Sequence, residues 1–324
     1  MHHIPYPAVF NLTNRWTPHA SACALTVGNF DGVHLGHAEI IGRLLAVAQQ
    51  QDLPAVVFTF DPHPATIVRP HAAPIQLTTS ARRTELLAAL GVDAVLVQPT
   101  EKHLIELEAG AFYADILRVR LQAAALVEGF DFRFGANRSG DIHLLQLLCN
   151  ADGLQLEKVA PVMVDGLPVS SSRIRALIGA GHVGEARQML AVPYRLTGTV
   201  VEGAKRGGPI GFPTANLAAI PTVLPAHGVY AACAAVVDQQ SSHQRRMWPA
   251  AVHIGPNISF GEAAITVEVH LIGFSGNLYD KNIDVDFLQR LRDTQKFASV
   301  GQLQAQLAID VSQAAQVAVA AKCF

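Results

Sequence analysis

The 324-residue chain has few charged residues, few cysteines and no long apolar run. Only 15% of its residues are charged and the formal net charge is −2, which argues against a protein that coats nucleic acid. No apolar run reaches the roughly 18 residues of a membrane-spanning helix. The start also lacks the basic and apolar segments of a signal peptide. We therefore expect a cytoplasmic protein with no membrane or nucleic-acid partner.

Cysteine is scarce, and its spacing excludes the common metal and redox motifs. Cys23, Cys149, Cys233 and Cys323 show neither CxxC nor zinc-ligand spacing. We expect all four to be small, buried, reduced side chains of a cytosolic protein. Because half of all residues are hydrophobic, a chain of this length can form two domains, each with its own core.

The first half of the chain alternates short apolar segments with helical ones, up to about residue 180. Strands are expected at residues 24–27, 54–60, 92–97 and 124–127, and helices at 37–48, 80–90 and 112–120. This alternation predicts a parallel sheet covered by helices, in which ligands bind at the carboxyl ends of the strands.

From about Tyr194 the chain changes to strand-like segments joined by Gly, Pro, Ser and Asn. Strands are expected at residues 196–201, 228–237, 247–254, 265–272 and 283–287. A short helix around 184–190 is expected at the junction, and helical signal returns after Phe287 and over residues 300–309. The second half is therefore predicted to be an antiparallel barrel or sandwich closed by C-terminal helices.

A glycine-rich turn, GNFDGVHLGH at residues 28–37, joins the first of these strands to a helix. Free backbone N–H groups at a helix N-terminus favour anions. His34 and His37 lie three residues apart on the first helical turn, so they point the same way. Together with close backbone approach at Gly36, this arrangement suits a nucleoside triphosphate. HxGH is the signature shared by nucleotidyltransferases and class I aminoacyl-tRNA synthetases.

A second segment, SSSRIR at residues 170–175, resembles the other nucleotidyltransferase signature. Taken alone, it is an ordinary serine N-cap on a surface helix. Paired with HxGH, it predicts that Ser171, Ser172 and Arg175 hold the leaving phosphates. The expected reaction is attack by a phosphate oxygen on the α-phosphorus of ATP. That nucleophile is already anionic, so positioning and charge neutralisation matter more than a strong base.

The second half carries a glycine-rich, basic stretch at residues 203–208, followed by GFPTANL. Backbone amides near Gly211 and the charge of Lys205 or Arg206 suit phosphates. Thr214 and Asn216 offer neutral oxygen ligands for Mg²⁺ that arrives with a nucleotide. A locally capped turn is the alternative interpretation. Glu268, on an alternating strand, is either a solvated surface residue or a general base.

Three segments resemble the prokaryotic bifunctional riboflavin kinase/FMN adenylyltransferase (FAD synthetase) family: residues 28–37, FTFDPHP at 58–64 and GFDFRFGANRSGD at 129–141. The resemblance continues in order from about Leu25 to Ala308. It implies a Rossmann-like nucleotidyltransferase domain with a parallel sheet over residues 1–186. An antiparallel, riboflavin kinase-like β-barrel would follow over residues 187–324. Such an enzyme makes FMN from riboflavin and then FAD from FMN, using ATP and Mg²⁺ and releasing pyrophosphate.

The resemblance also implies roles for individual residues. The catalytic residues would be His34, His37 and Glu268, the last as the base that takes a proton from riboflavin. Gly28, Asn29, Asp31 and Gly36 would surround the phosphates, and Thr214 and Asn216 match the PTAN motif of the kinase. The flavin contacts would be Phe58, Pro62, His63, Phe130, Asp131, Arg133 and Arg292. Without the resemblance, the phenylalanines at 58, 60, 130, 132 and 134 are equally well explained as core residues of strands.

Several residues depart from the family pattern. Asp61 stands where Glu is usual, and His253 and Thr294 replace the usual Asn and Glu. Gly208 stands where a basic residue is common, and Ile258-Ser259 replaces Pro-Thr. These changes leave open an adenylyltransferase whose barrel binds flavin but has lost kinase activity. A class I tRNA synthetase fragment is disfavoured because no KMSKS-like loop is present, and a non-catalytic flavin carrier is a further alternative. We expect a monomer or a weak homo-oligomer.

Overall fold

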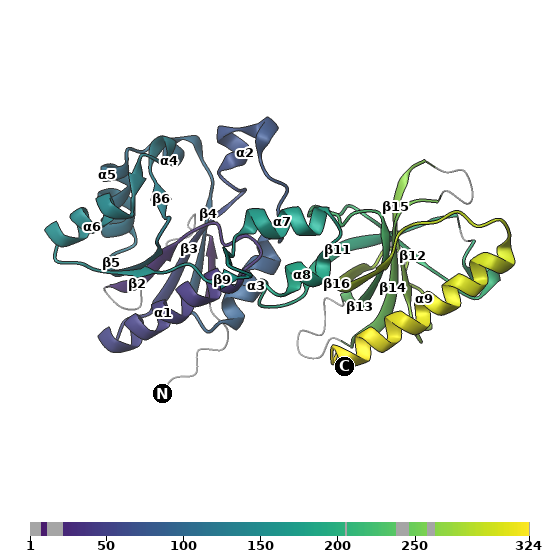
Figure 1. The fold of residues 1–324 in the computed structure, drawn as a ribbon. Coiled ribbons are helices and arrows are strands. Elements are labelled where there is room, and N and C mark those ends of the chain that lie inside the picture. The colour runs from purple at the N-terminus through teal and green to yellow at the C-terminus, as the bar shows by residue number, and fades with distance from the viewer. Residues whose placement is uncertain (1–7, 12–21, 205, 238–245, 258–262, 324) are drawn as a thin grey trace. The chain divides into compact units, whose positions relative to one another are not determined.

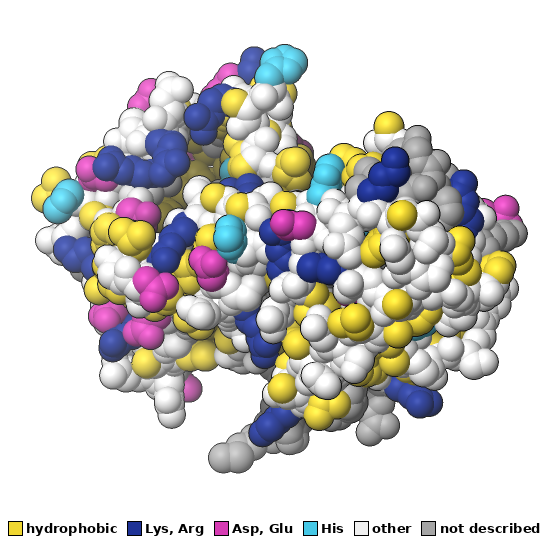
Figure 2. All heavy atoms as spheres, turned by 45° about the vertical axis from the view of Figure 1, so that its right-hand side comes forward, with side chains coloured by type: hydrophobic (Ala, Val, Ile, Leu, Met, Phe, Trp, Pro, Cys, Tyr) yellow, Lys and Arg dark blue, Asp and Glu magenta, His cyan; other side chains and the backbone are white. Residues whose placement is uncertain are grey.

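The computed structural model describes residues 8–11, 22–204, 206–237, 246–257 and 263–323. Its contacts divide the chain into two compact units, Met1–Ser170 and Ser171–Phe324 (Figure 1). This division is N-terminal to the domain boundary that the sequence predicts between residues 186 and 187. That boundary stays a prediction. Among the described residues, no helix combines the length and apolar character that crossing a lipid bilayer requires. On the face drawn in Figure 2, basic and acidic side chains of the first unit are interspersed.

The first unit is built on a six-stranded parallel sheet in the order β1-β4-β3-β2-β5-β8. The strands are β1 (Ala8–Asn11), β2 (Cys23–Val27), β3 (Ala55–Asp61), β4 (Ala94–Pro99), β5 (Ala123–Gly129) and β8 (Gln155–Val159). The helices are α1 (Leu35–Gln51), α2 (Ala65–Val68), α3 (Ser80–Ala89), α4 (Lys102–Ile105), α5 (Ala109–Ala111), α6 (Ile142–Ala151) and a π-helical segment, Phe112–Arg120. Two ribbons complete the unit: β6 (Arg133–Phe134) with β7 (Gly140–Asp141), and β9 (Met163–Val164) with β10 (Leu167–Pro168).

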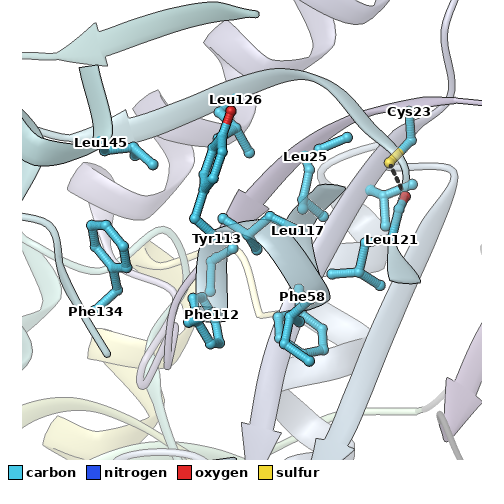
Figure 3. Close-up of a cluster of buried hydrophobic side chains, with 14 of the residues drawn as sticks. Cys23, Leu25, Phe58, Phe112, Tyr113, Leu117, Leu121, Leu126, Phe134 and Leu145 are labelled. Atoms are coloured by element: carbon cyan, nitrogen blue, oxygen red, sulfur yellow. Dashed lines mark hydrogen bonds between the residues drawn. The ribbon is translucent and has the colours of Figure 1, made fainter. Parts of the chain in front are cut away.

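The core of the first unit lies between the sheet and the helical segments that follow β4 and β7. Alternate residues of β2, Cys23, Leu25 and Val27, pack there against the π-helical segment and α6 (Figure 3). α1 contacts β2 and β5 and buries Ile41 and Leu44, which are outside that cluster. The predicted parallel sheet with covering helices is confirmed.

The topology places three loops at one edge of this sheet. β2 lies between β3 and β5 in the sheet, so these two strands flank β2 on opposite sides. Because all three strands are parallel, the loops that follow them leave from the same, carboxyl edge, where ligands bind in open α/β sheets. The predicted location of the glycine-rich turn is confirmed.

The second unit is a closed antiparallel barrel in the order β11-β12-β15-β14-β13-β16, which closes through pairing of β16 with β11. Its strands are β11 (Tyr194–Val201), β12 (Ala215–Ala218), β13 (Gly228–Val237), β14 (Trp248–Pro256), β15 (Ile265–Leu271) and β16 (Asn282–Arg292). Its helices are α7 (Ser171–Gly179), α8 (Val183–Arg187) and α9 (Val300–Ala320), and α9 packs on β13, β14 and β16. The barrel was predicted, with a sandwich as the alternative.

The boundary between β16 and the closing helix corrects one expectation. Helical structure was expected directly after Phe287, yet β16 continues to Arg292, because this stretch pairs with β13. α9 starts at Val300, where Ser299 caps it by accepting a hydrogen bond from the N–H of Gln302 at 3.3 Å. The helix then continues to Ala320 through an alanine-rich segment for which the sequence predicted no structure.

The cysteines also require a correction. Cys233 on β13 and Cys323 just after α9 form a disulfide, with Cα atoms 6.3 Å apart and 90 residues between them in sequence. The expectation of reduced thiols is wrong for this pair, because the packing of α9 on β13 brings the two residues together. Cys23 and Cys149 are buried and free, as expected. Burial raises the pKa of the Cys23 thiol to about 12.

Candidate active sites

The loop at residues 28–37 holds an unusual backbone at the end of β2. The Gly28 N–H donates to the Phe58 carbonyl at 3.0 Å, and the Val33 N–H donates to the Phe30 carbonyl at 3.1 Å. Phe30 (φ +49°) and Val33 (φ +40°) are left-handed, a conformation that costs of order 1–3 kcal/mol at a non-glycine residue. Both side chains are buried. Packing therefore maintains a strained loop of the kind found at functional sites.

The two predicted histidines lie together at the start of α1. His34 is the N-cap, and its Nδ1 accepts a hydrogen bond from the His37 N–H at 3.3 Å. The two rings stack, with centroids 3.6 Å apart and an interplanar angle of 14°. A Cβ at Gly36 would lie 3.2 Å from the His34 ring, so a glycine there leaves room for the imidazole. The sequence prediction that these side chains point the same way agrees with this geometry.

Burial determines the charge of this pair. It lowers the pKa of His34 to about 4, although the nearby Asp31 carboxylate opposes the shift. It also lowers the pKa of His37 well below its usual value, and His34 and Arg83 add to that effect. Both imidazoles are therefore neutral at pH 7. They can donate hydrogen bonds to phosphate oxygens, but they bring no positive charge.

Asp31 and Asn29, both predicted near the phosphates, differ in their contacts. The Asp31 carboxylate accepts from the N–H groups of Leu77 and Thr78 at 2.9–3.0 Å and from the Thr78 hydroxyl at 3.1 Å. Asp31 thus anchors a neighbouring segment to the loop. By contrast, the Asn29 Oδ1 is buried with no hydrogen-bond partner among the described residues. Phosphate contact stays a prediction for both.

The predicted flavin residues of the first unit occupy different environments. Pro62 and His63 follow β3, where the His63 Nδ1 accepts from the Ala65 N–H at 3.0 Å. Phe130 follows β5 and is 50% exposed, as a ligand contact requires. Asp131 is exposed on the same loop, and Arg133, exposed at the start of β6, lies 3.5 Å from Asp141.

Phe58 differs from these loop residues because it lies in the core. It is 1% exposed and lies in the buried cluster of Figure 3. Its ring packs edge-on against Phe60, with ring centroids 5.0 Å apart. Its contacts are those of a packing residue, so its flavin role stays a prediction that these contacts do not support. Ser171, Ser172 and Arg175 lie on α7, which belongs to the second unit. Their role at the triphosphate also stays a prediction.

The second unit holds a cavity of about 160 Å³ on the outer face of the barrel. Val267, Val269 and Leu271 of β15 are buried, while Glu268 alternates with them and faces the cavity. α9 contributes Leu303, Leu307, Asp310 and Val311 to the wall, and other lining residues include Arg206, Phe212, Thr214, Asn216, His253, Asn257, Arg292 and Phe297. The half-buried strand predicted around Glu268 therefore forms part of a cavity.

Glu268 lies among hydrogen-bond donors at the ends of neighbouring strands. Its Oε1 accepts from the Asn257 Nδ2 at 2.8 Å, and its Oε2 lies 3.4 Å from the Thr214 hydroxyl. Asn216 on β12 is its partner in the strand register, and a Cβ at Gly203 would overlap the Asn216 amide. The structure thus brings the three predicted kinase residues together. Asn257 was missed, because only strand pairing places it beside the carboxylate.

Two further predicted residues lie near this group. Gly211 is left-handed (φ +89°), and the following Phe212 N–H donates to the Gly207 carbonyl at 2.9 Å, which closes a tight turn. Lys205 lies outside the described residues. On the other side, His253 is the register partner of Glu268 on β14, and burial lowers its pKa against the opposing effect of Glu268.

Arg292 lines the cavity, but much of its guanidinium is already engaged. Its Nε and Nη2 donate to the two carboxylate oxygens of Asp310 at 2.9 and 2.6 Å, and its Nη1 donates to the Asp293 carbonyl at 2.8 Å. Asp310 is 1% exposed and also accepts from Gln306 at 2.9 Å. α9 therefore fixes the direction of the arginine. Sequence analysis did not identify Asp310, because its partner Arg292 lies on β16 and not on the same helix.

The first unit is of the nucleotidyltransferase type, with an HxGH pair at the edge of a parallel sheet, and the second is a barrel with a carboxylate-bearing cavity. A model of the FAD synthetase family matches residues 17–173, and a model of the riboflavin kinase family matches residues 190–318. The chain belongs to the bifunctional riboflavin kinase/FMN adenylyltransferase family.

Individual relatives match along nearly their whole length. The chain is 36% identical to the bifunctional riboflavin kinase/FMN adenylyltransferase of Pseudomonas fluorescens, over 93% of this chain and 94% of that protein. The chain is 34% identical to the Escherichia coli K12 protein of the same name, over 89% of this chain and 90% of that protein. A crystal structure of a Streptococcus pneumoniae protein described as a macrolide-efflux protein has a TM-score of 0.82 and 31% identity, and covers 95% of this chain and 98% of that one.

Proposed function

We propose that this chain carries both activities of its family, phosphorylation of riboflavin to FMN in the second unit and adenylylation of FMN to FAD in the first. The family matches cover the two units separately. The observation that carries the kinase half is the position of Glu268, which faces the cavity with Thr214 and Asn216 beside it.

In the kinase half, a neutral alcohol must become a nucleophile. The terminal ribityl hydroxyl oxygen attacks the γ-phosphorus of ATP, the bond to the β-phosphate oxygen breaks, and ADP leaves. Glu268 takes the hydroxyl proton, a role that requires a carboxylate within hydrogen-bond reach. Asn257 holds one carboxylate oxygen at 2.8 Å, which leaves the other directed to Thr214 and to substrate.

The same residues fit a magnesium ion. The Thr214 hydroxyl and the Asn216 amide oxygen are the hard oxygen donors that Mg²⁺ prefers. The described residues contain no cluster of three or more His, Cys, Asp or Glu that could hold a metal by themselves. An ion carried in by the nucleotide phosphates suits such a donor set, and when bound it neutralises phosphate charge.

In the adenylyltransferase half, the nucleophile is an FMN phosphate oxygen that is already anionic. It attacks the α-phosphorus of ATP, and the bond to the β-phosphate oxygen breaks to release pyrophosphate. No proton needs to be removed, so neutral His34 and His37 serve as hydrogen-bond donors to phosphate oxygens. Ser171, Ser172 and Arg175 are proposed to hold the leaving phosphates, as their motif implies.

A barrel that binds flavin without kinase activity is the weaker candidate. The departures at His253 and Thr294 leave Thr214, Asn216 and Glu268 together in the cavity. Our proposal also includes a cytoplasmic location, a monomer or weak homo-oligomer, and no nucleic-acid partner.

A time course of flavin products tests the proposal. Purified chain with riboflavin, ATP and Mg²⁺ should form FMN first and FAD later, with release of ADP and then pyrophosphate. Starting from FMN, it should form FAD and pyrophosphate without ADP, and chelation of Mg²⁺ should stop FMN formation. Formation of FAD from FMN but no FMN from riboflavin would leave an adenylyltransferase alone. Flavin binding without pyrophosphate release would indicate a carrier.

A further inference from the structure

Arg83 is a fully buried arginine at the carboxyl end of β3. It lies on α3, and its Nη2 donates to the Phe60 carbonyl at 2.8 Å and lies 3.9 Å from an Asp61 carboxylate oxygen. Its Nε and Nη1 are buried with no hydrogen-bond partner in the described part of the chain. The guanidinium thus uses few of its donors, although it is completely shielded from solvent.

Such an arrangement is costly for a structural arginine. A guanidinium stays protonated in proteins, and native structures leave few buried donors unpaired. Burial lowers the pKa of Arg83, and the carboxylates of Asp61 and Asp31 oppose that shift. However, the Asp31 oxygens already accept from residues 77 and 78, and the Asp61 contact is long. Among the described residues, these two strong donors therefore have no acceptors.

The unpaired donors belong to a group of unsatisfied polar atoms around the HxGH loop. The Nδ1 of His37 and the Oδ1 of Asn29 are also buried without a partner among the described residues. Arg83 is near enough to lower the pKa of His37. Since both imidazoles are neutral at pH 7, Arg83 supplies the positive charge in this group. Phosphate oxygens are acceptors that suit a permanently charged, planar guanidinium with its N–H donors in fixed positions.

We propose that Arg83 binds a substrate phosphate in the adenylyl-transfer site, with its Nε and Nη1 donating to phosphate oxygens. The proposal rests on the proposed adenylyltransferase activity. ATP and FMN share this chemistry, so the experiment distinguishes them. Because the two nitrogens are covered in the described structure, side chains above them must move when the phosphate binds.

The experiment compares Arg83→Met, Arg83→Lys and a control, Arg82→Met, in the full chain. Arg82 is the preceding residue on α3, and its guanidinium pairs with Glu85 at 2.8 Å. FAD formation from FMN is measured with ATP varied and then with FMN varied. Riboflavin phosphorylation by the second unit serves as an internal reference, and thermal unfolding reports whether the first unit is folded.

We expect Arg83→Met to raise one KM by about 10- to 100-fold, the loss typical of a hydrogen bond to a charged group. A rise confined to ATP assigns Arg83 to the triphosphate, and one confined to FMN assigns it to the flavin phosphate. Arg83→Lys keeps the charge but loses the planar guanidinium and its fixed N–H directions, and should recover part of the loss. Arg82→Met and riboflavin phosphorylation should stay within about twofold of the original chain.

Unchanged KM values in folded Arg83→Met would overturn the proposal. If that variant does not fold, unchanged KM values in Arg83→Lys would do so, since a lysine ammonium cannot place donors at both guanidinium positions. Failure of the unsubstituted chain to convert FMN into FAD would instead contradict the proposed function.

Discussion

The two units face the same substrate, ATP, with opposite electrostatic designs. The first presents neutral imidazoles on a strained loop, and the described contacts place no base beside them: the Asp31 carboxylate is held by backbone N–H groups. The second presents the Glu268 carboxylate on a regular strand, with hydroxyl and amide donors around it. The difference follows the nucleophiles, because a phosphate anion needs only positioning whereas an alcohol must lose a proton.

The largest effect expected is that of Glu268→Gln. The amide keeps the shape of the side chain but cannot accept the proton, so FMN formation should fall by about 10²–10⁴-fold. FAD formation from FMN should be unchanged. Flavin products are measured by chromatography from each starting flavin. Glu185→Gln, on the exposed face of α8 in the same unit, is the matched control. Equal loss of both activities would contradict two separate sites.

The converse change is His37→Ala. Loss of the imidazole removes a donor to the phosphate oxygens, so adenylyl transfer should fall by about 100-fold, a loss typical of such donors. Riboflavin phosphorylation should be retained, and the melting temperature should change little. His103→Ala, an exposed histidine of the first unit, controls for general effects. Near-normal FAD formation would remove His37 from the mechanism.

A smaller effect is expected at Asp310, which orients Arg292. Asp310→Asn replaces one acceptor of the bidentate pair by a donor, so Arg292 should lose its fixed direction toward the cavity. We expect the KM for riboflavin to rise about 10-fold, with FAD formation from FMN unaffected. Asp280→Asn is the control, since Asp280 is exposed and its left-handed conformation suits asparagine. An unchanged KM would make this ion pair purely structural.

The smallest effect concerns pH and the first unit. The pKa of His34 is about 4 in the folded chain and 6.5 when exposed, so the unfolded chain binds more protons between these values. Stability should therefore fall as pH falls through this window, by about 1 kcal/mol per pH unit. Hydrogen exchange of the amides of β2 and α1, compared at pH 7 and 5.5, measures this change in the free energy of unfolding. In His34→Asn, which retains an N-cap acceptor, the part of the pH-dependent stability that comes from His34 should disappear. An equal slope in both proteins would assign the pH dependence to other groups.

Local patterns of the sequence were enough to predict most of the architecture. The alternation in the first half predicts the parallel sheet, and the period-two pattern around Glu268 predicts a strand with one buried face. Prediction was wrong after Phe287, where strand pairing with β13 overrides the local helical signal. It was also wrong for Cys233 and Cys323, whose proximity depends on a contact across 90 residues.

By itself the sequence determined the order of the elements, the HxGH turn at a helix start and the PTAN segment, because these depend on neighbours within a few residues. Tertiary structure alone decided that Asn257 and His253 flank Glu268, that Asp310 holds Arg292, and that Phe58 is a core residue. It also decided the charge of the histidines, because burial is a property of the packed chain. Strand register and helix packing join residues that are far apart in sequence, and local periodicity carries no information about such pairs.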